Sequence, residues 1–567
     1  MKESRLSNIW FINLGVLLIA LLLVAKLGYL QIMHGEVYRD KADAQYLIPS
    51  NGFDRGQIFF QEKSGRTIAA ATVVPDYTLA IDPSKIVDKQ GLADKLLAFI
   101  KFDRADFIAR ASHVGSQYEE IAKHLNEDEI TGVQSLHAKG VILKKDKKRF
   151  YPGIKAAAQV LGFVGSNGET VAGRYGLEKY YNDTLTREGT GGSTSFFADL
   201  FLKPGAAILS DRAKQGDIVT TIEPTVQGFL ERVLQQDVLE KYKAASASGI
   251  IMDPVTGAIY AMGTAPAFDP NNFSKEKDAS VYSNPLVDGI YEMGSIVKPL
   301  TMAAGLDAGV VTAQTTYDDK GFLIINKKRI SNYDGRGRGV VPMQIILNDS
   351  LNTGAVFVMN KLGKDSFRNY MKAFGLGEET GIDLPNEGVG NIKNLESPRD
   401  IEYATASFGQ GISMTPIETI RALAALGNGG LLVTPHVVAR TEYGLAPAQN
   451  FVANPGKQVI KKETSTEITR MLTEVVDKAL MGGTLKMQHY SIAAKTGTAQ
   501  LVEDGGYSES DYLHTFFGYF PSNNPRFIVF LAVKNPRGEK YASHTLSLPF
   551  MQIAKFLINY YDIPPDR

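Results

Sequence analysis

The longest run of hydrophobic positions lies close to the N-terminus. It extends from Ile9 to Leu30 and follows the basic residues Lys2 and Arg5. A helix of these 22 residues would be about 33 Å long, enough to cross the hydrocarbon core of a bilayer. Because the positive flank is on the N-terminal side, the pattern predicts a cytoplasmic N-terminus and places the rest of the chain outside.

A cleaved signal peptide is the alternative explanation of this run. The first small-residue pattern of the cleavage type, Ala42-Asp43-Ala44, lies far beyond the apolar stretch. We therefore expect an uncleaved anchor. No second apolar stretch reaches spanning length, so the sequence predicts a single-pass membrane protein with a large extracytoplasmic part.

Residues 36–215 alternate short hydrophobic runs with polar segments. Three runs predict strands and two predict helices: 57–61, 76–82 and 140–145 for the strands, 102–112 and 118–125 for the helices. The basic run at 144–149 is expected at a solvated hairpin tip, and the glycine-rich residues 187–195 in a loop. Because no catalytic pattern falls here, the region is interpreted as a β-rich pedestal or interaction module.

The pattern changes at residue 216. A strand at 216–222 leads into a long amphipathic helix that begins at Pro224, a residue suited to a first helical turn. Further patterns predict a hairpin, two strands around a turn and a final helix: 250–253 with 258–263, 514–521 with 525–536, and 548–561. Strands at both ends with helices between them predict one large mixed α/β domain over 216–567.

Composition narrows the function. The 567 residues suggest about three or four domains. Basic and acidic residues number 61 each, which argues against a strongly cationic nucleic-acid-binding surface. With no cysteine, disulfides and thiolate chemistry are excluded. The 8 histidines show no metal-binding spacing, so no metal is expected, and His514 is interpreted as a packed strand histidine.

Ser295 and Lys298 stand three apart at the head of a small and apolar run. At that spacing the two side chains share a helix face, so the lysine amine can reach the serine hydroxyl. If burial and nearby cations lower the pKa of the lysine, its neutral amine can act as a base toward the hydroxyl. A second Ser-x-x-Lys, Ser274 with Lys277, lies in a polar context that predicts a surface loop.

Two further patterns follow in chain order. Ser350-Leu351-Asn352 precedes an apolar helix, where a helix N-cap is the structural alternative. Lys495-Thr496-Gly497-Thr498 has a glycine that would let a substrate backbone approach, with a strand-to-turn transition as the alternative. Similar patterns at Lys63-Ser64-Gly65 and at Ser522-Asn523-Asn524 lie out of order. The ordered set is a known signature of class A β-lactamases and penicillin-binding proteins.

The sequence resembles class B penicillin-binding proteins, the monofunctional peptidoglycan D,D-transpeptidases, over most of the chain beyond the anchor. The motifs that carry this resemblance are FDRGQI with SGRTIA, RFYPG, AQVLGFVG, GRYGLEKYYNDTL, IEPTVQ, MDPVTGAIYAM and FGQGISMTPIE. Met293 departs from the family, which usually has proline before the Gly-Ser pair. The implied fold is a mixed α/β protein with three parts. These are a cytoplasmic tail and single transmembrane helix (1–35), a β-rich pedestal or dimerisation-type domain (36–215), and a transpeptidase domain with a central antiparallel sheet flanked by helices (216–567).

The resemblance implies four catalytic residues. Ser295 would attack the penultimate D-Ala carbonyl of a stem peptide, and Lys298 would take its proton. Ser350 would relay protons to the leaving amine, while Lys495 would supply positive charge. An amine of a neighbouring stem would then resolve the acyl-enzyme, and β-lactams would acylate Ser295 in the same way.

The resemblance also implies substrate-binding residues in the second and third motifs. Asn352 would hydrogen-bond the substrate amide, and Thr496 and Thr498 would hold the terminal carboxylate, with Gly497 between them. The backbone N–H groups of Ser295 and Thr498 would face the oxyanion. No cofactor and no metal are implied.

Several rival functions share these motifs. D,D-carboxypeptidases and β-lactamases deacylate with water, and a non-catalytic tethered scaffold or β-lactam sensor is a further alternative. The anchor, the pedestal and the absent cleavage site favour a wall synthase over these alternatives. The compact chain and the KTGTAQ and FGQGISMTP stretches favour the division type over the elongation type. By resemblance it would sit in the bacterial cytoplasmic membrane with its catalytic domain outside. Its partners would be lipid-linked peptidoglycan precursors, a polytopic glycan polymerase, and other divisome or elongasome membrane proteins.

Overall fold

A computed structural model describes most of the chain. The described residues are 26, 54–166, 171–187, 214–444, 446–452, 456–503 and 506–567. Within these ranges no helix is long and apolar enough to cross a membrane. The predicted anchor at Ile9–Leu30 lies outside them apart from Lys26, as does most of the predicted loop at 187–195.

The chain divides into two compact units. The described part of the smaller unit is 76–146, and that of the larger unit is 54–75, 147–187 and the described residues from 214 onward. Residues on both sides of the predicted boundary at 215/216 therefore pack together in the larger unit. The three predicted domain ranges, 1–35, 36–215 and 216–567, remain predictions.

The smaller unit has an apolar core of its own, which includes Leu79, Leu96 and Phe107. Its helices are α3 (Lys89–Leu97), α4 (Arg104–Arg110) and α5 (Glu127–Ser135), and the predicted helix at 102–112 corresponds to α4. Each of the three begins after a side chain that accepts a hydrogen bond from the first turn: Asp88, Asp103 and Asn126. Such caps fix where each helix starts.

Two predictions for this region are wrong. Residues 118–125 form the strand β3 (Glu119–Ala122) instead of a helix, because the segment pairs antiparallel with β2 (Thr67–Ile81). The basic run 144–149 is not a hairpin tip but lies inside β4 (Val141–Phe150), which also pairs with β2. Long lysine side chains can extend from a strand into water, so the charge of the run does not prevent strand formation.

The larger unit begins with β1 (Ile58–Gln61), as the pattern at 57–61 predicts. β1 pairs parallel with β7 (Gly216–Thr220), which in turn pairs antiparallel with β15 (Val438–Tyr443). Near β1, Glu178 is fully buried between two arginines, with Arg55 Nε at 2.5 Å and Arg149 Nε at 2.6 Å. This buried cluster joins segments that are distant in the sequence.

A five-stranded antiparallel sheet forms the centre of the larger unit. Its order is β18-β19-β20-β8-β9, so β18 is an edge strand. The five strands are β8 (Ser246–Met252), β9 (Ile259–Ala265), β18 (Ala493–Glu503), β19 (Gly506–Phe520) and β20 (Phe527–Lys534). The predicted hairpin and the two predicted late strands are all present. Because β8 lies beside β20, segments far apart in the sequence meet in one sheet.

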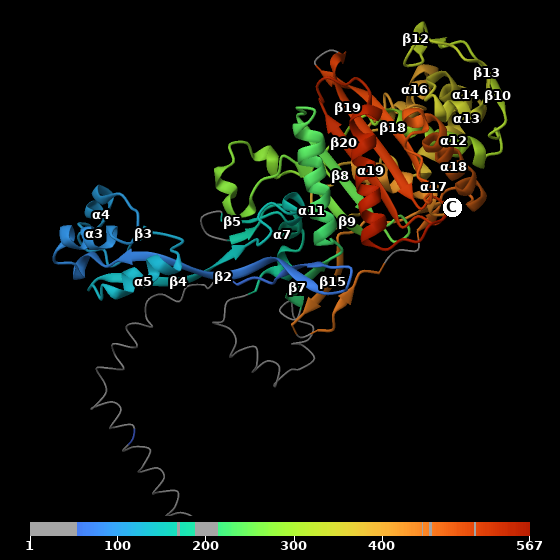
Figure 1. Ribbon diagram of the computed structural model, residues 1–567. Coiled ribbons are helices and arrows are strands. Elements are labelled where there is room, and N and C mark those ends of the chain that lie inside the picture. The colour runs from blue at the N-terminus through green and yellow to red at the C-terminus, as the bar shows by residue number, and fades with distance from the viewer. Residues whose placement is uncertain are drawn as a thin grey trace, which may run out of the picture. The chain divides into compact units, whose positions relative to one another are not determined.

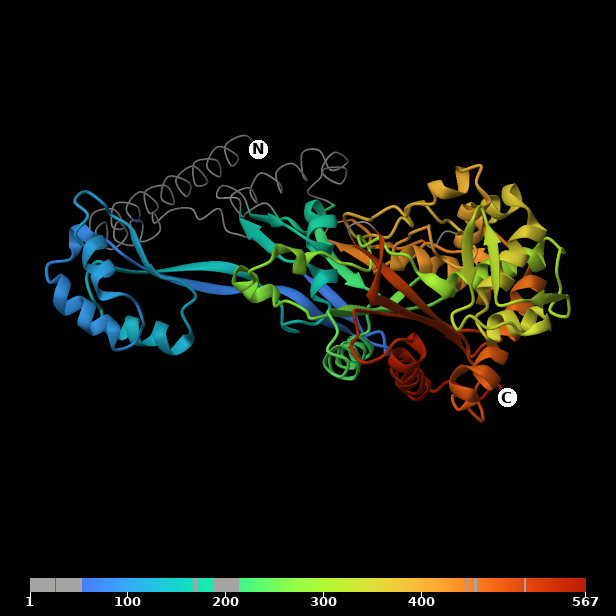
Figure 2. The same ribbon diagram turned by 90° about the horizontal axis from the view of Figure 1, so that it is seen from above.

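Helices cover both faces of this sheet (Figure 1, Figure 2). On one face lie α11 (Pro224–Arg232), which continues as a π-helix over Val233–Glu240, and the terminal α19 (Ala542–Tyr560). On the other face lie α12 (Lys298–Asp307), α17 (Pro416–Gly427) and α18 (Lys462–Glu474). This arrangement confirms the predicted mixed α/β class with a central antiparallel sheet.

The remaining elements are short or lie outside the central layers. The helices are α6 (Ala158–Leu161), α7 (Gly176–Tyr180), α8 (Asn182–Leu185), α13 (Met343–Asn348), α14 (Asn352–Leu362), α15 (Lys364–Ala373) and α16 (Asp400–Ala406). The strands are β5 (Val164–Ser166), β6 (Val171–Gly173), β10 (Thr316–Asp319), β11 (Phe322–Ile325), β12 (Lys328–Ser331), β13 (Gly339–Pro342), β14 (Leu431–Leu432), β16 (Gln449–Asn450) and β17 (Lys457–Gln458). The short 3-10 and π segments are η1 (Pro83–Lys85), η5 (Pro270–Lys275), η6 (Ala279–Tyr282), η7 (Gly294–Val297), η8 (Lys393–Glu396), η9 (Val475–Ala479) and η10 (Leu480–Gly483).

Candidate active site

Ser295 lies in the 3-10 turn η7, directly before α12. The turn packs closely against the edge strand β18: a Cβ added to Gly294 would lie 3.0 Å from the carbonyl oxygen of Thr498. Met293 is fully buried, and its carbonyl accepts a 3.1 Å hydrogen bond from the Thr515 hydroxyl. Ser295 itself stays partly exposed, so the turn presents one hydroxyl at the surface of an otherwise buried helix.

Lys298 is buried beneath Ser295, with 1% of its surface exposed. Its Nζ lies 3.0 Å from Ser295 Oγ, 3.1 Å from Ser350 Oγ and 2.5 Å from the Ser350 carbonyl oxygen. Burial, and then the charge of Lys495, hold the pKa of Lys298 well below its usual value. An amine that can be neutral therefore lies within hydrogen-bond reach of the Ser295 hydroxyl.

Lys495 approaches the same place from β18. Its Nζ donates to Ser350 Oγ at 3.1 Å and to the carbonyl oxygen of Thr496 at 3.0 Å. Only 3% of this residue is exposed, and burial lowers its pKa to about 8. The Ser350 hydroxyl thus lies between two lysine nitrogens, a position from which it can pass a proton.

Ser350 occupies the loop between α13 and α14 with a φ of +53°. The left-handed region costs a non-glycine residue roughly 1–2 kcal/mol. The helix begins at Asn352 with Leu351 as its N-cap residue, so the N-cap explanation of Ser350 is wrong. Strained backbone of this kind concentrates at functional sites, where the surrounding structure holds it in place.

Asn352, Thr496 and Thr498 complete the wall around Ser295. The Asn352 side-chain amide donates a 2.8 Å hydrogen bond to the Ser331 carbonyl, which fixes the orientation of the side chain. Thr498 Oγ1 accepts from the backbone N–H of Ala542 at 3.1 Å. Because a hydroxyl can accept and donate at once, Thr498 keeps its proton for a ligand.

Position 497, on the inner side of β18, has no room for a side chain larger than that of glycine. A Cβ there would lie 2.4 Å from Thr515 Oγ1 and 2.7 Å from the Met293 carbonyl oxygen. The crowding comes from η7 and β19 and not from the cleft. This glycine therefore has a packing role, since it lets β18 lie against the turn that carries Ser295. The expectation that it also lets a substrate backbone approach stays a prediction.

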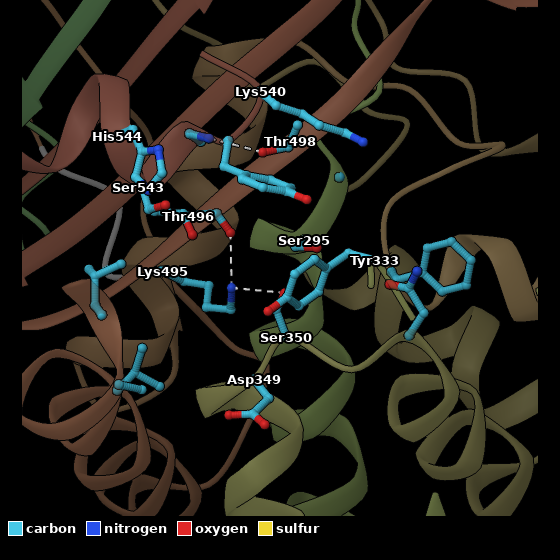
Figure 3. A pocket seen from close by; sticks show the side chains of 18 of the residues that line it. Ser295, Tyr333, Asp349, Ser350, Lys495, Thr496, Thr498, Lys540, Ser543 and His544 are labelled. Atoms are coloured by element: carbon cyan, nitrogen blue, oxygen red, sulfur yellow. Dashed lines mark hydrogen bonds between the residues drawn. The ribbon is translucent and has the colours of Figure 1, made fainter. Parts of the chain in front are cut away.

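These residues surround one cleft of about 670 Å³. Its lining includes Ser295, Ser350, Asn352, Lys495, Thr496 and Thr498. Figure 3 shows Lys495 reaching toward Ser350, with Thr496 and Thr498 on the strand beside it. Of the eight predicted site residues, only Lys298, beneath the floor, and Gly497, on the inner side, are outside this lining.

Sequence reasoning missed several residues of the cleft. Tyr333, Phe408, Met481 and Tyr541 all line it. The rings of Tyr333 and Tyr541 meet edge to face with centroids 5.7 Å apart, although the two residues are distant in the sequence. Nothing in their local sequence spacing distinguishes them from ordinary loop aromatics, so only the folded arrangement identifies them.

A buried polar network behind the cleft was also missed. Asp319, at the end of β10, is 2% exposed and accepts hydrogen bonds from Gly321, Asn332, Arg338 and Thr353. Asn332 Oδ1 accepts in turn from the backbone N–H and the hydroxyl of Thr353. Because Thr353 directly follows Asn352, this network fixes the start of α14. Exposure alternates along β10, but the sequence Asp318-Asp319 itself does not show which of the two carboxylates points inward.

The competing patterns do not lie in any comparable site. Ser274 and Lys277 are exposed on a surface segment, as the sequence predicts. His514 is fully buried, with Nδ1 2.9 Å from Thr545 Oγ1 and Nε2 3.1 Å from the Lys540 carbonyl oxygen. Burial lowers its pKa to about 4, in agreement with a packed strand histidine. Among the described residues no cluster of three His, Cys, Asp or Glu side chains could hold a metal ion.

The geometry defines a class of site. The site has a serine nucleophile and an amine base. The Ser295 hydroxyl is partly exposed, the desolvated amine of Lys298 lies 3.0 Å away, and a second lysine, Lys495, approaches from the edge strand. The sheet behind it, flanked by helices on both faces, is the scaffold of penicillin-recognising serine enzymes, for which the ordered Ser-x-x-Lys, Ser-x-Asn and Lys-Thr-Gly motifs are a signature.

Comparison with family models agrees with this class. A model described as the penicillin binding protein transpeptidase domain matches residues 247–553, and one described as the penicillin-binding protein dimerisation domain matches residues 53–199. The chain therefore belongs to the penicillin-binding proteins, with the domain pairing of their class B branch.

Relatives support this placement. The chain is 31% identical to Stage V sporulation protein D of Bacillus subtilis, over 96% of this chain and 85% of that protein. It is 27% identical to peptidoglycan D,D-transpeptidase FtsI of Buchnera aphidicola, over 100% of this chain and 97% of that one. The structure of penicillin binding protein 3 of Mycobacterium tuberculosis complexed with aztreonam shares the fold, with a TM-score of 0.68 and 20% identity, covering 91% of this chain and 98% of that chain.

Proposed function

We propose that this protein is a serine-type peptidoglycan D,D-transpeptidase that cross-links stem peptides during bacterial cell-wall synthesis. The observation that carries the proposal is the distance of 3.0 Å between the desolvated amine of Lys298 and the hydroxyl of Ser295. Family membership and the names of relatives such as FtsI support the same reaction.

The first half of the reaction forms an acyl-enzyme. Ser295 Oγ attacks the carbonyl carbon of the penultimate D-Ala while its proton passes to the neutral amine of Lys298. The tetrahedral intermediate collapses, the C–N bond breaks, and the terminal D-Ala leaves as an amine. The proton held by Lys298 reaches this amine through the Ser350 hydroxyl, which lies 3.1 Å from the amines of both Lys298 and Lys495.

The second half uses the same groups in reverse. The amine of a neighbouring stem peptide gives up a proton through Ser350 to Lys298 and attacks the ester carbonyl. The proton then returns to Ser295 Oγ as the ester bond breaks. A new amide joins the two stems, and the enzyme is regenerated without a cofactor or a metal.

Binding of the donor peptide depends on the cleft wall. In this proposal the hydroxyls of Thr496 and Thr498 donate to the terminal carboxylate, and Lys495 adds positive charge. Asn352 bonds the donor amide, and the backbone N–H groups of Ser295 and Thr498 face the oxyanion. One oxyanion donor of this type lowers the barrier by about 3–4 kcal/mol in other serine enzymes.

We place the protein in the bacterial cytoplasmic membrane, with an anchor in residues 1–35, a pedestal in 36–215 and the transpeptidase domain in 216–567 outside. The apolar run Ile9–Leu30 supports the anchor. A polytopic glycan polymerase of the divisome is the proposed membrane partner. Co-purification in mild detergent tests this partner, and failure to recover any polymerase would count against it.

A role at the division septum follows from the relatives named FtsI. The relative named as a sporulation protein makes a role in sporulation the second candidate. A fluorescent fusion distinguishes them, since septal function predicts midcell signal in growing cells. Signal along the side wall would instead indicate an elongation role, and signal confined to sporulating cells a sporulation role.

Covalent labelling tests the reaction itself. The full-length protein treated with penicillin should gain one adduct in the mass spectrum, on Ser295. Ser295→Ala and Lys298→Ala should gain none. Lys277→Ala, in the exposed second Ser-x-x-Lys pattern, should be labelled normally. Labelling of Ser295→Ala at an equal rate would remove the nucleophile assignment. Rapid turnover of penicillin in place of a lasting adduct would indicate a hydrolase.

A further inference from the structure

A second hollow adjoins the candidate active site. It has a volume of about 610 Å³ and shares Asn352, Phe408 and Gln410 with the first cleft. Most of its other lining residues lie in or beside β12, α16 and the start of β19, with Lys328, Arg399 and Tyr507 among them. We call it the lateral hollow. No motif identified in the sequence assigns a role to these three elements.

The edge strand β18 connects the two hollows. Thr496, Thr498 and Gln500 alternate along β18 and line the first cleft. Further along, the strand pairs with Tyr507, which lines the lateral hollow. An unpaired strand edge can accept an extended peptide as an additional strand. A donor whose carboxylate lies at Thr496 and Thr498 therefore continues past Asn352 into the lateral hollow.

Two charged residues of the lateral hollow, Arg399 and Glu292, already have partners within the protein. Arg399 pairs with Glu402 at 3.2 Å. Glu292 accepts hydrogen bonds from the Gly411 backbone N–H at 2.9 Å and from the Tyr507 hydroxyl at 3.0 and 3.1 Å. Burial raises the pKa of Glu292. Its carboxylate is thus already engaged by protein groups and is poorly available to a cationic ligand.

Lys328 and Arg329 remain as exposed cations at the rim. Within the described part of the chain, neither has a carboxylate at ion-pair distance. Arg329 lies over the Phe322 ring at 4.0 Å and donates to Ser331 Oγ at 3.1 Å, so its guanidinium is held in place. A cationic rim beside a peptide path favours an acidic peptide segment.

The hairpin that carries these cations is fixed at both ends. Its turn accepts a hydrogen bond from the Ile401 N–H at 3.0 Å through Asn326 Oδ1. Its far end accepts one from Asn352 through the Ser331 carbonyl at 2.8 Å. The cations therefore keep a defined position relative to the donor-binding wall.

We propose that the lateral hollow is a subsite for a carboxylate-bearing segment of the donor peptide, on the N-terminal side of the scissile amide, with Lys328 and Arg329 as its counter-charges. The inference rests on the proposed function, because it takes the direction of the donor from Thr496 and Thr498. It adds the preference for an acidic upstream segment over a neutral one of equal size.

A matched pair of donor substrates tests the subsite. Two D-Ala-D-Ala-terminated peptides differ only upstream of the scissile residue, where one carries glutamate and the other glutamine. The rate of Ser295 acylation by each is measured with the full-length protein, and the ratio of the two rates is compared between variants. Penicillin labelling of each preparation measures how much of the protein is active.

The wild type should acylate about fivefold faster with the acidic donor, as two partly exposed ion pairs allow. The ratio should fall with rising salt and should approach one in Lys328→Gln/Arg329→Gln, which removes two positive charges. Lys327→Glu is the matched control, because it makes the same charge change on the neighbouring exposed residue outside the hollow, and it should keep the wild-type ratio.

Two results would overturn the subsite: a wild-type ratio of one, or an acidic preference that persists in the double variant. A loss of preference in Lys327→Glu as well would show a diffuse field in place of a subsite and would also overturn it. These outcomes are separate from failure of the proposed function, which would appear as absent penicillin labelling of Ser295.

Discussion

At the scale of single residues, the pKa of two lysines decides what the cleft can do. Both lysines are almost fully buried, and each contacts the Ser350 hydroxyl. Burial disfavours the charged form of each, and the charge of Lys495 lowers the pKa of Lys298 further. The repulsion from Lys495 favours the neutral form of Lys298, which can then act as a base, whereas Lys495, with a pKa of about 8, is mostly charged at neutral pH.

The pKa of Lys495 predicts an alkaline limit for acylation. With a pKa of about 8, Lys495 is charged below pH 8 and loses its proton above it, so attraction for the carboxylate of penicillin weakens as the pH rises. The acylation rate should fall above about pH 8, approaching tenfold per pH unit if the charge is essential. Stopped-flow measurement of penicillin acylation between pH 6 and 10 gives the profile.

Lys495→Arg provides the matching control. Arginine stays protonated throughout this range, so the variant should acylate more slowly because its geometry is altered, but without the fall near pH 8. A fall at the same pH in the arginine variant would assign the limit to another group. As the pH falls, protonation of Lys298 should slow acylation in the wild type and in the arginine variant.

At the scale of elements, the position of α14 depends on the buried carboxylate of Asp319. Four donors from three segments converge on it. Asp319→Ala would remove the acceptor that these four donors share and would leave the backbone N–H groups of Gly321 and Arg338 without it, and the expected cost is about 3 kcal/mol or more of unfolding free energy. Because Thr353 and Asn352 would shift together, penicillin acylation should also slow by at least about tenfold.

The neighbouring residue of the same strand supplies the control. Asp318 is exposed in β10, where exposure alternates from residue to residue, so Asp318→Ala should change both properties little. Chemical denaturation and acylation kinetics of the two variants make the comparison. Equal effects at 318 and 319 would contradict a specific role for the inward carboxylate.

Element predictions from sequence succeeded where a pattern reflects local geometry. The strands at 250–253 and 258–263 and the final helix follow from alternation and helical period alone. The segment 118–125 failed because pairing with β2 decided its conformation, and a partner strand is not visible in a local window. The basic run 144–149 failed since charge was taken as a sign of a turn, although a strand can carry it.

At the scale of the whole molecule, the larger unit is joined by the cluster around Glu178. Its carboxylate is fully buried and receives Arg55, Arg149 and the Tyr151 hydroxyl at 3.2 Å. Replacing it by glutamine would leave two buried guanidinium groups without a counter-charge. Glu178→Gln should lower the unfolding free energy by about 3–5 kcal/mol, measurable by urea denaturation.

An exposed pair tests whether this loss comes from burial. Asp365 pairs with Arg368 at 2.6 Å, but 85% of its side chain is exposed. Asp365→Asn should therefore cost less than about 1 kcal/mol, because water screens the pair. If the two substitutions proved equally mild, the buried cluster would not be an important link between residues 54–75 and 147–187.

The sequence alone determined which chemical groups this protein carries and in what order. Ser295 and Lys298 lie on one helix face because three positions make nearly one helical turn, and this relation needs no other part of the chain. The family resemblance, the mixed α/β class and the apolar run near the N-terminus are likewise properties of local pattern and residue order.

Only the tertiary structure decided how those groups behave. It placed Ser350 in a left-handed conformation between two lysines and turned Gly497 toward the interior. It also set a cationic hairpin beside the cleft. The physical reason is that desolvation and close packing arise from segments distant in the sequence, so the pKa of Lys298 is a property of its surroundings and not of its own motif.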